Sequence, residues 1–513
     1  MVAIALIIAL DGFLMGFDTS VISGVVEFIE IEFSLTSLQL GWSVSSLTLS
    51  ATMAMLAAGP LSDRIGRLHV LRISAVLFGI SAIVSAAAPN FTILVLARML
   101  GGLGVGASLI TAPMLIAEMA PASSRGKLVS FNQFNIVIGI SLAFFSNYLI
   151  LVLGQSDANW VESLKLNEWA WRWMLGIEMI PAIFYYLALN LVPESPRWLV
   201  LQGREGEAFS VLVRINGNEQ AEIELDRIRK NLFQEKNREE ASWRMLFTSS
   251  LKLVLLIGVS IGILQQITGI NAVFYYAPMI FEQSGIGTDA AFMQAVLVGV
   301  INVIFTVLAM ALIDRIGRKS LLVVGLSGIT FFMGLLSYGF GSATYSLDIQ
   351  GLVNLPAALE ILNTSGIQGI VFDSDVEYRQ AMVAILGSEQ YSQHQSILIS
   401  EAISVQPGLI LIGILGFVAS FAVSLGPVMW VLFSELFPNR IRGKAISFAG
   451  LINSSIAFLV TFAFPWELEN LGNATTFLIY AVFAFAGLAM VIKILPETKG
   501  KTLEQIEGEL VGS

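Results

Sequence analysis

Twelve long apolar stretches divide this chain of 513 residues, and they restrict it to one class of fold. A helix needs about 20 mostly apolar residues to cross the hydrocarbon core of a bilayer. Only 13% of the residues are charged and 56% are hydrophobic, too few polar groups to cover a soluble protein. The sequence therefore predicts an all-α membrane protein with twelve transmembrane helices. The expected spans are roughly 2–26, 40–61, 69–88, 91–117, 128–153, 171–192, 252–281, 290–313, 320–341, 408–434, 445–466 and 473–495.

The composition also excludes several kinds of chemistry. The chain has no cysteine, so disulfides, thiolate metal sites and thiol catalysis are ruled out. Its two histidines, His69 and His394, lie far apart in the sequence, which argues against a zinc site. The net charge of −10 argues against a nucleic-acid partner. We therefore expect no metal, no cofactor and no enzymatic activity.

The basic residues predict the orientation of the spans, because cytoplasmic loops are enriched in lysine and arginine. With both termini inside, 24 of the 28 basic residues fall in cytoplasmic segments. Lys165, Arg379 and Arg172 remain on the other side, and Arg98 lies within a span. We therefore expect a multi-pass protein of the cell (inner) membrane with both termini in the cytoplasm.

Two long polar segments interrupt the apolar pattern. Residues 193–251 form a charged linker that we expect to lie in the cytoplasm and to contain short amphipathic helices. Residues 342–407 form a long, acid-rich loop on the opposite side, which is either a small folded cap or a flexible insert. The predicted organisation is a six-helix half at 1–192, the linker, a second half at 252–495, and a cytoplasmic tail at 496–513.

Three short motifs occur twice and in the same order, which indicates an internal duplication. DRIGR stands at 63–67 and at 314–318. The pattern E-x-x-P-x-x-x-R-G starts at Glu118 and again at Glu435, and P-E-[ST] starts at Pro193 and at Pro496. Two parallel six-helix repeats with a binding site between them near the middle of the membrane are typical of secondary transporters.

The repeated motifs place acids and arginines together on the cytoplasmic side of both halves. Such groups can pair between neighbouring helices when this side is closed, and modest ion pairs suit a gate that must open and close. The alternative is that they only fix topology and bind lipid headgroups. The predicted gating residues are Asp63, Arg64, Arg67, Glu118, Arg125, Glu194, Arg197, Asp314, Arg315, Arg318, Glu435 and Arg442.

Longer motifs resemble the sugar porter family of the major facilitator superfamily over nearly the whole chain. The most specific are PESPRWL at 193–199, QQITGINAVFYYAP at 265–278 and PETKGKTLEQIE at 496–507. GPLSDRIGR at 59–67 and GPVMWVLFSELFPNRIRG at 426–443 agree with them. The resemblance is strongest to bacterial proton-coupled monosaccharide symporters. It implies the major facilitator fold and transport of a sugar together with a proton.

Neutral amides within the spans predict the sugar site, because amides both donate and accept hydrogen bonds and are costly in the membrane unless used. The alternative is that they only join helices, and for Asn132 we prefer this interpretation. By resemblance, the sugar-contacting residues are Gln133, Gln265, Gln266, Asn271, Asn302 and Trp430, with Tyr275 and Asn453 less certain. Ser454 stands where the family often has tryptophan, which leaves the identity of the sugar open.

Three charged residues within spans predict the coupling site. Asp18, Arg98 and Glu178 fall in spans one, four and six, where lone charges are costly and usually pair or move protons. By resemblance, an aspartate at position 18 is typical of the proton symporters. The alternative is a permanent structural ion pair. Asp11 is a further acid in span one, to which we assign no role.

The predicted function is therefore import of a monosaccharide by proton symport, through alternating access of two halves around a central site. The main alternative is an uncoupled carrier of a sugar or of a polyol such as inositol, in which Asp18 is structural. A sugar sensor of transporter shape is disfavoured by the short segment after Pro496, and a channel by the duplicated halves. We expect a monomer whose partners are the sugar, protons and lipid.

Overall fold

The computed structural model describes most of the chain, and every structural statement below concerns that part. It covers residues 2–120, 125–236, 243–248, 251–438 and 441–501, together with Gln505. Side chains at positions 125–127, 129, 130, 216, 235, 236 and 243 lie outside this description. Secondary structure in the described residues is almost entirely helical.

Eleven helices among the described residues are long and apolar enough to cross a membrane. One of them, α23 (Arg442–Ile494), has 53 residues, more than twice the length that a span needs. Its backbone leaves the helical region at Gly472 (φ 78°, ψ 164°), so α23 consists of two successive helices with a break between them. This break falls between the two last predicted spans, and the all-α fold with twelve spans agrees with the structure.

The contacts between residues divide the chain into two compact units. Unit 1 consists of Met1–Thr19, Ser46–Ile140 and Leu175–Ser242. Unit 2 consists of Ser20–Ser45, Ser141–Met174 and Trp243–Ser513. Some of the helices of the first half therefore run from unit 1 into unit 2.

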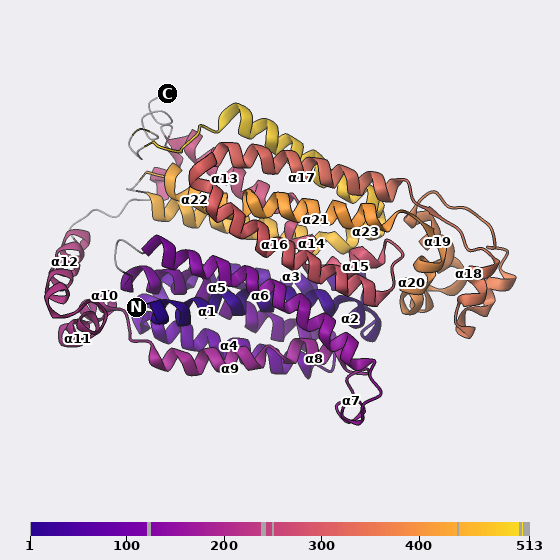
Figure 1. Ribbon diagram of the computed structural model, residues 1–513, viewed down its shortest axis with the longest axis horizontal. Helices are drawn as coiled ribbons and strands as arrows, with labels where there is room; N and C mark the ends of the chain where they lie inside the picture. Colours follow the sequence, from indigo (N-terminus) through magenta and orange to yellow (C-terminus); the bar gives the residue numbers. More distant parts are fainter. Residues whose placement is uncertain are drawn as a thin grey trace. The chain divides into compact units, whose positions relative to one another are not determined.

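The helices of the first half pack around a shared apolar core in unit 1, to which α1, α4 and α5 contribute (Figure 1). The side chain of Asn90 accepts a hydrogen bond from the Ile93 amide (3.0 Å) and so caps α5. The helices are α1 (Val2–Val21), α2 (Val26–Glu32), α3 (Ser37–Ile65), α4 (Arg67–Ala86), α5 (Phe91–Met119), α6 (Arg125–Gly154), α7 (Asn159–Ser163), α8 (Ala170–Gly176) and α9 (Met179–Ala188), with η1 (Ile22–Gly24) and η2 (Leu189–Leu191) between them.

Glycines in α5 allow two helices to approach closely within unit 1. A Cβ atom added at Gly106 would lie 2.0 Å from the Ala51 carbonyl oxygen of α3, and one at Gly102 would lie 2.2 Å from the Leu47 carbonyl oxygen. Neither position can therefore carry a side chain without moving the backbone. The glycine-rich run at 101–106 is a helix-packing surface, as in other membrane helices.

The linker between the halves forms short helices, as predicted. They are α10 (Pro196–Leu201), α11 (Glu205–Asn216), α12 (Asn218–Lys236) and η3 (Trp243–Phe247). Trp198, Leu212 and Leu225 belong to a small apolar core that joins the first three of them. Arg229 of α12 pairs with Glu205 of α11 at the surface.

The helices of the second half lie alongside one another in unit 2 (Figure 1). Two of its membrane segments are broken. The seventh span turns at Gly269 (φ 89°) and again at Tyr276, and the tenth breaks at Ser424 (φ −127°, ψ −95°). The helices are α13 (Lys252–Ile267), α14 (Ile270–Tyr275), α15 (Ala277–Glu282), α16 (Thr288–Ile316), α17 (Arg318–Gly341), α21 (Pro407–Val423), α22 (Leu425–Leu436) and α23.

Residues 342–407 form a folded cap at one end of these helices (Figure 1). Two short antiparallel strands, β1 (Thr344–Tyr345) and β2 (Ile403–Ser404), join its ends. The cap has its own apolar core, which includes Tyr378, Met382 and Leu398. Of the two predicted possibilities, the folded cap is correct. Its helices are α18 (Ile349–Asn354), η5 (Ala357–Thr364), α19 (Asp375–Leu386) and α20 (Ser388–Ala402).

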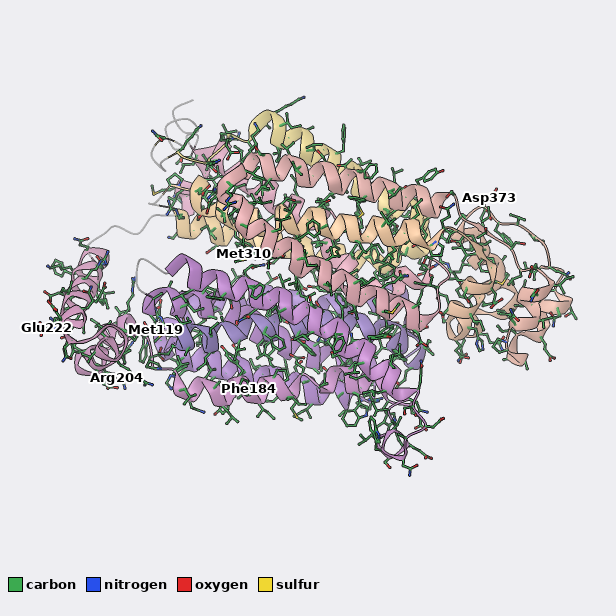
Figure 2. The ribbon with its side chains drawn as sticks, viewed as in Figure 1. Met119, Phe184, Arg204, Glu222, Met310 and Asp373 are labelled. Atoms are coloured by element: carbon green, nitrogen blue, oxygen red, sulfur yellow. The ribbon has the colours of Figure 1, made fainter. Side chains whose placement is uncertain are left out.

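Apolar side chains project outward from the long helices, whereas charged ones gather on the linker and the cap. Phe184 of α9 is 63% exposed, and Figure 2 shows it projecting from the helix surface. The same figure shows Arg204 and Glu222 on the linker helices and Asp373 on the cap. Exposed apolar surface along these helices is expected where they face lipid.

Candidate functional site

Four of the predicted amides form one hydrogen-bonded network in unit 2. Asn453 of α23 donates to the Gln265 side-chain oxygen (2.9 Å) and to the Gly262 carbonyl oxygen (2.8 Å). Gln266 donates to the Gln265 side-chain oxygen (3.2 Å), and Asn271 donates to the Gln266 side-chain oxygen (2.9 Å). Amides separated by almost 190 positions in the sequence thus meet at one place. Amide groups both donate and accept hydrogen bonds, as the hydroxyl groups of a sugar require.

Breaks in the helices hold this network in position. Gln265 donates to the carbonyl oxygens of Leu425 (3.1 Å) and Gly426 (3.4 Å) at the start of α22. At the other break, a Cβ atom on Gly269 would lie 2.7 Å from the Tyr480 ring, so glycine fits both the positive φ and the space. Irregular backbone at membrane depth occurs where it is buried in protein or lines a cavity.

Of the other predicted sugar contacts, three lie in unit 2 with this network and one lies in unit 1. Asn302 of α16 and Tyr275 of α14 are buried in unit 2. Trp430 of α22 is 40% exposed and packs edge-on against Phe433, so a large part of its ring remains uncovered. Gln133 lies on α6 in unit 1 and is half-buried. Asn132 packs against Gly12 of α1, a position that suits helix packing.

Asp18, Arg98 and Glu178 come together in the interior of unit 1. Arg98 of α5 forms an ion pair with the Asp18 carboxylate of α1 and donates to the Asp18 carbonyl oxygen (2.9 Å). The Glu178 carboxyl group lies within hydrogen-bonding reach of Asp18. The three residues are 0%, 2% and 1% exposed. Because carboxylates only accept hydrogen bonds, a contact between two carboxyl groups requires a proton on one of them.

Small residues make room for this cluster. A Cβ atom added at Gly101 of α5 would lie 2.9 Å from a carboxylate oxygen of Asp18 and 2.6 Å from the Ser81 hydroxyl oxygen. The Ser81 hydroxyl donates to the Ala97 carbonyl oxygen (2.9 Å). The further acid, Asp11, is fully buried on α1 beside Ser108 and Tyr185. Asp11, Asp18 and Glu178 therefore lie with Arg98 in the interior of unit 1.

The repeated motif of the first half forms an ion network around Arg67. Its guanidinium contacts the carboxylates of Glu118 (3.1 Å) and Asp63 (2.8 Å) and donates to the Ser62 carbonyl oxygen (3.1 Å). Ser195 donates its hydroxyl proton to Glu118. The Glu194 carboxylate accepts hydrogen bonds from the Leu68 amide (3.2 Å) and so covers the first turn of α4.

The second half repeats this arrangement with its own copies of the motif residues. Arg318 contacts Glu435 (2.9 Å) and Asp314 (3.0 Å), and Thr498 donates to Glu435 (2.7 Å). The Glu497 carboxylate accepts a hydrogen bond from the Arg318 amide (3.0 Å), as Glu194 does in the first half. In both halves a glycine with positive φ precedes the arginine, Gly66 (φ 101°) and Gly317 (φ 105°). The duplication read from the sequence is therefore a duplication of contacts.

The remaining predicted gating residues take other positions. Arg442 donates to the Phe437 carbonyl oxygen (3.1 Å), and the Arg315 carbonyl oxygen accepts from Lys499. Arg64 is exposed at the end of α3, and Arg197 is half-buried on α10. The side chain of Arg125 lies outside the described residues. The ion pairs of Arg67 and Arg318 each lie within one unit.

Two groups of polar residues in the structure were absent from the sequence-based prediction. Ser195, Glu497 and Thr498 complete the ion networks, and their position in the repeated P-E-[ST] motif was the signal for them. Glu282 is buried, and Glu27 and Glu30 are half-buried, where α2 and α15 meet the cap. They lie just beyond the ends of predicted spans, where acidic residues are common and do not by themselves indicate a site. No cluster of metal-binding side chains occurs among the described residues.

Two six-helix halves with matching ion networks, a buried amide network and a buried charge cluster define a secondary transporter of the major facilitator type. The chain belongs to the sugar transporter family: the family model "Sugar (and other) transporter" matches residues 4–355 and 381–510. It is not an enzyme family, and its members include sugar–proton symporters.

Relatives of known activity cover nearly the whole chain. The arabinose-proton symporter of Bacillus subtilis is 36% identical over 97% of this chain and 92% of its own length. The D-xylose-proton symporter of Escherichia coli K12 is 35% identical over 98% and 94%. Among solved structures, the inward-open xylose transporter XylE from E. coli matches with a TM-score of 0.75 at 33% identity, covering 99% of both chains. XylE bound to 6-bromo-6-deoxy-D-glucose matches with a TM-score of 0.67 at 33% identity.

Proposed function

We propose that this protein imports a monosaccharide together with a proton. The observation that carries the proposal is the buried cluster of Asp18, Arg98 and Glu178. Charges inside a membrane protein are expensive to bury and are retained where they move ions or protons. Protonation of Asp18 weakens its attraction for Arg98, so that gain or loss of one proton changes how α1 and α5 hold together.

The sugar is proposed to bind at the amide network of Gln265, Gln266, Asn271 and Asn453. These residues support the proposal because they are neutral, at least half-buried and already linked by hydrogen bonds, so their orientation is fixed before a sugar arrives. The exposed ring of Trp430 offers an apolar face for the CH groups of a sugar. The remaining proposed contacts are Gln133, Tyr275 and Asn302.

Transport is proposed to follow alternating access, with the halves 1–192 and 252–495 moving about this site. The linker 193–251 and the tail after Pro496 are proposed to stabilise the cytoplasmic ends of the halves through Glu194 and Glu497. We further propose that both termini face the cytoplasm, that the membrane is the cell's inner membrane, and that the protein works as a monomer. The distribution of basic residues supports the orientation.

Uptake into proteoliposomes with and without an inward proton gradient tests the proposal, with a panel of hexoses, pentoses and inositol. Accumulation of one sugar above equilibrium, together with alkalinisation of the outside, is the expected result. Uptake that only equilibrates and ignores the gradient would instead favour the second candidate, an uncoupled carrier. The panel includes several classes of sugar and a polyol because Ser454, next to Asn453, leaves more space than the tryptophan common in the family.

A further inference from the structure

Two glutamates meet where the first and seventh spans end. Glu27 lies on α2, just after span one, and Glu282 is the last residue of α15. Their carboxyl groups lie within hydrogen-bonding reach of one another, and Glu282 is 6% exposed. Two ionised carboxylates have no proton to place between them. A hydrogen bond between the two carboxyl groups therefore requires a proton on one of them.

The pair lies beside a small cavity, and one of its carboxyl oxygens has no hydrogen-bond partner among the described residues. A small cavity of about 30 Å³ lies beside Glu27 and Glu282 and is also lined by Glu30 and Gln283. The Oε1 atom of Glu282 has no hydrogen-bond partner among the described residues, although it is buried. A buried carboxyl oxygen without a partner is costly when it carries charge. Thr288 interacts with the Glu282 carboxyl group from the start of α16.

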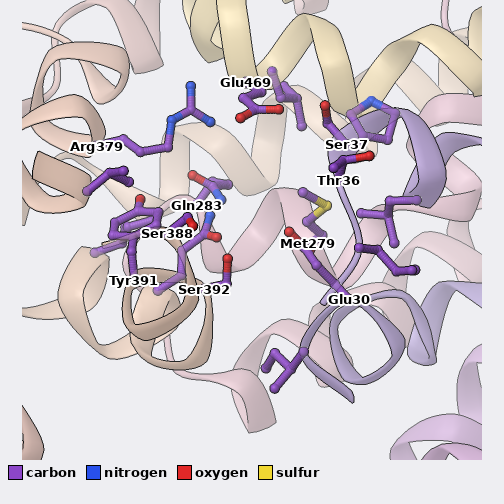
Figure 3. A pocket seen from close by; sticks show the side chains of 18 of the residues that line it. Glu30, Thr36, Ser37, Met279, Gln283, Arg379, Ser388, Tyr391, Ser392 and Glu469 are labelled. Atoms are coloured by element: carbon purple, nitrogen blue, oxygen red, sulfur yellow. The ribbon is translucent and has the colours of Figure 1, made fainter. Parts of the chain in front are cut away.

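A larger cavity of about 500 Å³ adjoins the pair beneath the cap (Figure 3). Figure 3 shows Glu30 from α2, Gln283 following α15, and Ser392 and Tyr391 from α20 around the same space. Among the described residues that line it, Arg379 is the only cation. The other titratable side chains that face this region are Tyr276, Tyr345, Asp375, Tyr378, Glu389 and Glu469.

The charge balance of this region favours proton uptake. Burial raises the pKa of Glu27 and raises that of Glu282 strongly, the latter with help from the charge of Glu27. Burial, followed by the charges of Glu27 and Glu469, raises the pKa of Glu30 to about 7, against a lowering effect of Arg379. Asp375 is engaged by the backbone amide (2.9 Å) and the side chain (2.7 Å) of Asn473.

We propose that Glu27 and Glu282 form a second protonation site, which takes up a proton when the ends of α2 and α15 close on each other and releases it when they separate. The inference rests on the proposed function, because alternating access is the motion that separates these ends. In the structure they are held together: α15 packs on η1, and α20 of the cap packs on both α2 and α15.

This proton differs from the one that is coupled to sugar. Both glutamates lie on the side predicted to be extracytoplasmic, so the proton returns to the side from which it came. It performs no transport and instead makes closure on that side depend on external pH. Separated and hydrated carboxyl groups regain their ordinary pKa, so the closed arrangement binds more protons than the open one. External acid therefore favours closure, and raising the pH through the elevated pKa values opposes it.

A cysteine reporter can follow this closure directly, because the natural chain has no cysteine. Ser392→Cys places a thiol of similar size in the cavity. A membrane-impermeant maleimide, added to right-side-out vesicles without sugar or gradient, reports the open fraction. The labelling rate of the Ser392→Cys chain is divided by the rate for a Gln380→Cys chain, whose cysteine lies at an exposed position on α19. This ratio removes the pH dependence of the thiol–maleimide reaction. We expect the ratio to fall about 10-fold or more from pH 8 to pH 5.5, with a slope of at most tenfold per pH unit for one proton.

Glu282→Gln and Glu27→Gln, each in the Ser392→Cys chain, test the pair. An amide in place of one carboxyl group donates the hydrogen bond without taking up a proton from solution. Each variant should therefore stay closed, and its labelling should be nearly independent of pH. Glu389→Gln, an exposed glutamate at the same cavity, is the matched control and should keep the response of the parent. Sugar counterflow shows that each variant is folded. An unchanged pH response in both pair variants, or its loss in Glu389→Gln, would overturn the proposal.

The Asp18→Asn variant separates this inference from the proposed function. It should lose coupling but keep the pH response of labelling, because Asp18 is not among the groups that act on Glu27 and Glu282. Loss of that response together with coupling would assign the effect to Asp18 and contradict a second site. Failure of sugar accumulation with an intact labelling response would leave the pair in place and count against symport only.

Discussion

A carboxylate buried between helices must either keep a partner or take up a proton. Asp18 has one neighbour of each charge type, the guanidinium of Arg98 and the carboxyl group of Glu178. Arg98 stabilises its charge, whereas the Glu178 carboxyl group lies within hydrogen-bonding reach of it. A cluster with one guanidinium and two carboxyl groups balances its charge with one proton. A single residue thus connects protonation to the packing of α1 on α5.

Asp18→Asn should abolish accumulation of sugar against its gradient and leave exchange of sugar between the two sides. Asparagine keeps the shape of the side chain and its hydrogen bonds but cannot release a proton. Uphill uptake and counterflow in proteoliposomes measure the two activities separately. Undiminished uphill uptake by this variant would show that Asp18 is structural.

Replacing Gln265 or Asn453 by alanine should raise the KM for sugar at least about 5-fold. Each change leaves buried amide partners without a hydrogen bond, which costs about 1–3 kcal/mol. The matched control is Asn190→Ala, an exposed amide on η2 that bonds only to the helix before it. Initial uptake rates over a range of sugar concentrations provide the measurement. Equal KM values for all three variants would place the sugar elsewhere.

At the scale of elements, helix contacts in both units depend on the absence of side chains at particular positions. Gly106 of α5 contacts the backbone of α3, and Gly325 of α17 lies so close to Ser424 that an added Cβ would be 1.8 Å from its hydroxyl oxygen. The sequence indicated close packing for the glycine run of α5. It could not indicate the partner helix, because an apolar face fits many neighbours in a membrane.

Gly106→Ala should destabilise the protein by about 1–3 kcal/mol, since the new methyl group forces α5 and α3 apart. Gly334→Ala on α17 is the matched control, because nothing lies within 4 Å of its added Cβ and alanine favours helix. Thermal unfolding in detergent compares the two variants. A Tm for Gly106→Ala at or above that of Gly334→Ala would contradict the close approach seen here.

The two ion networks should matter for the rate of transport and not for sugar affinity. Glu118→Gln or Glu435→Gln removes a carboxylate from Arg67 or Arg318, and we expect slower uptake at saturating sugar with KM unchanged within about 3-fold. Glu205→Gln breaks the exposed pair with Arg229 and should change neither quantity. Uptake kinetics decide this. A full rate in both network variants would reduce these residues to determinants of topology.

At the scale of the whole molecule, the sequence predicted the number of spans, the duplication and the folded linker, because each follows from hydropathy or from repeated motifs. It also indicated that Asp18 and Arg98 could pair, because charged residues within spans usually do so, and the structure pairs them. The glutamates Glu27 and Glu282 escaped prediction. They stand more than 250 positions apart and acquire their character only from the burial that the cap provides.

The cap begins and ends on the same two-residue ladder, where Thr344 faces Ser404 and Tyr345 faces Ile403. The family model leaves residues 356–380 unmatched, and this gap falls inside the cap. Chain ends that lie side by side can be joined by a short turn without stretching α17 or α21. We therefore expect the cap to be exchangeable: its replacement by the cap of a relative or by a rigid fusion partner leaves the connection from α17 to α21 intact.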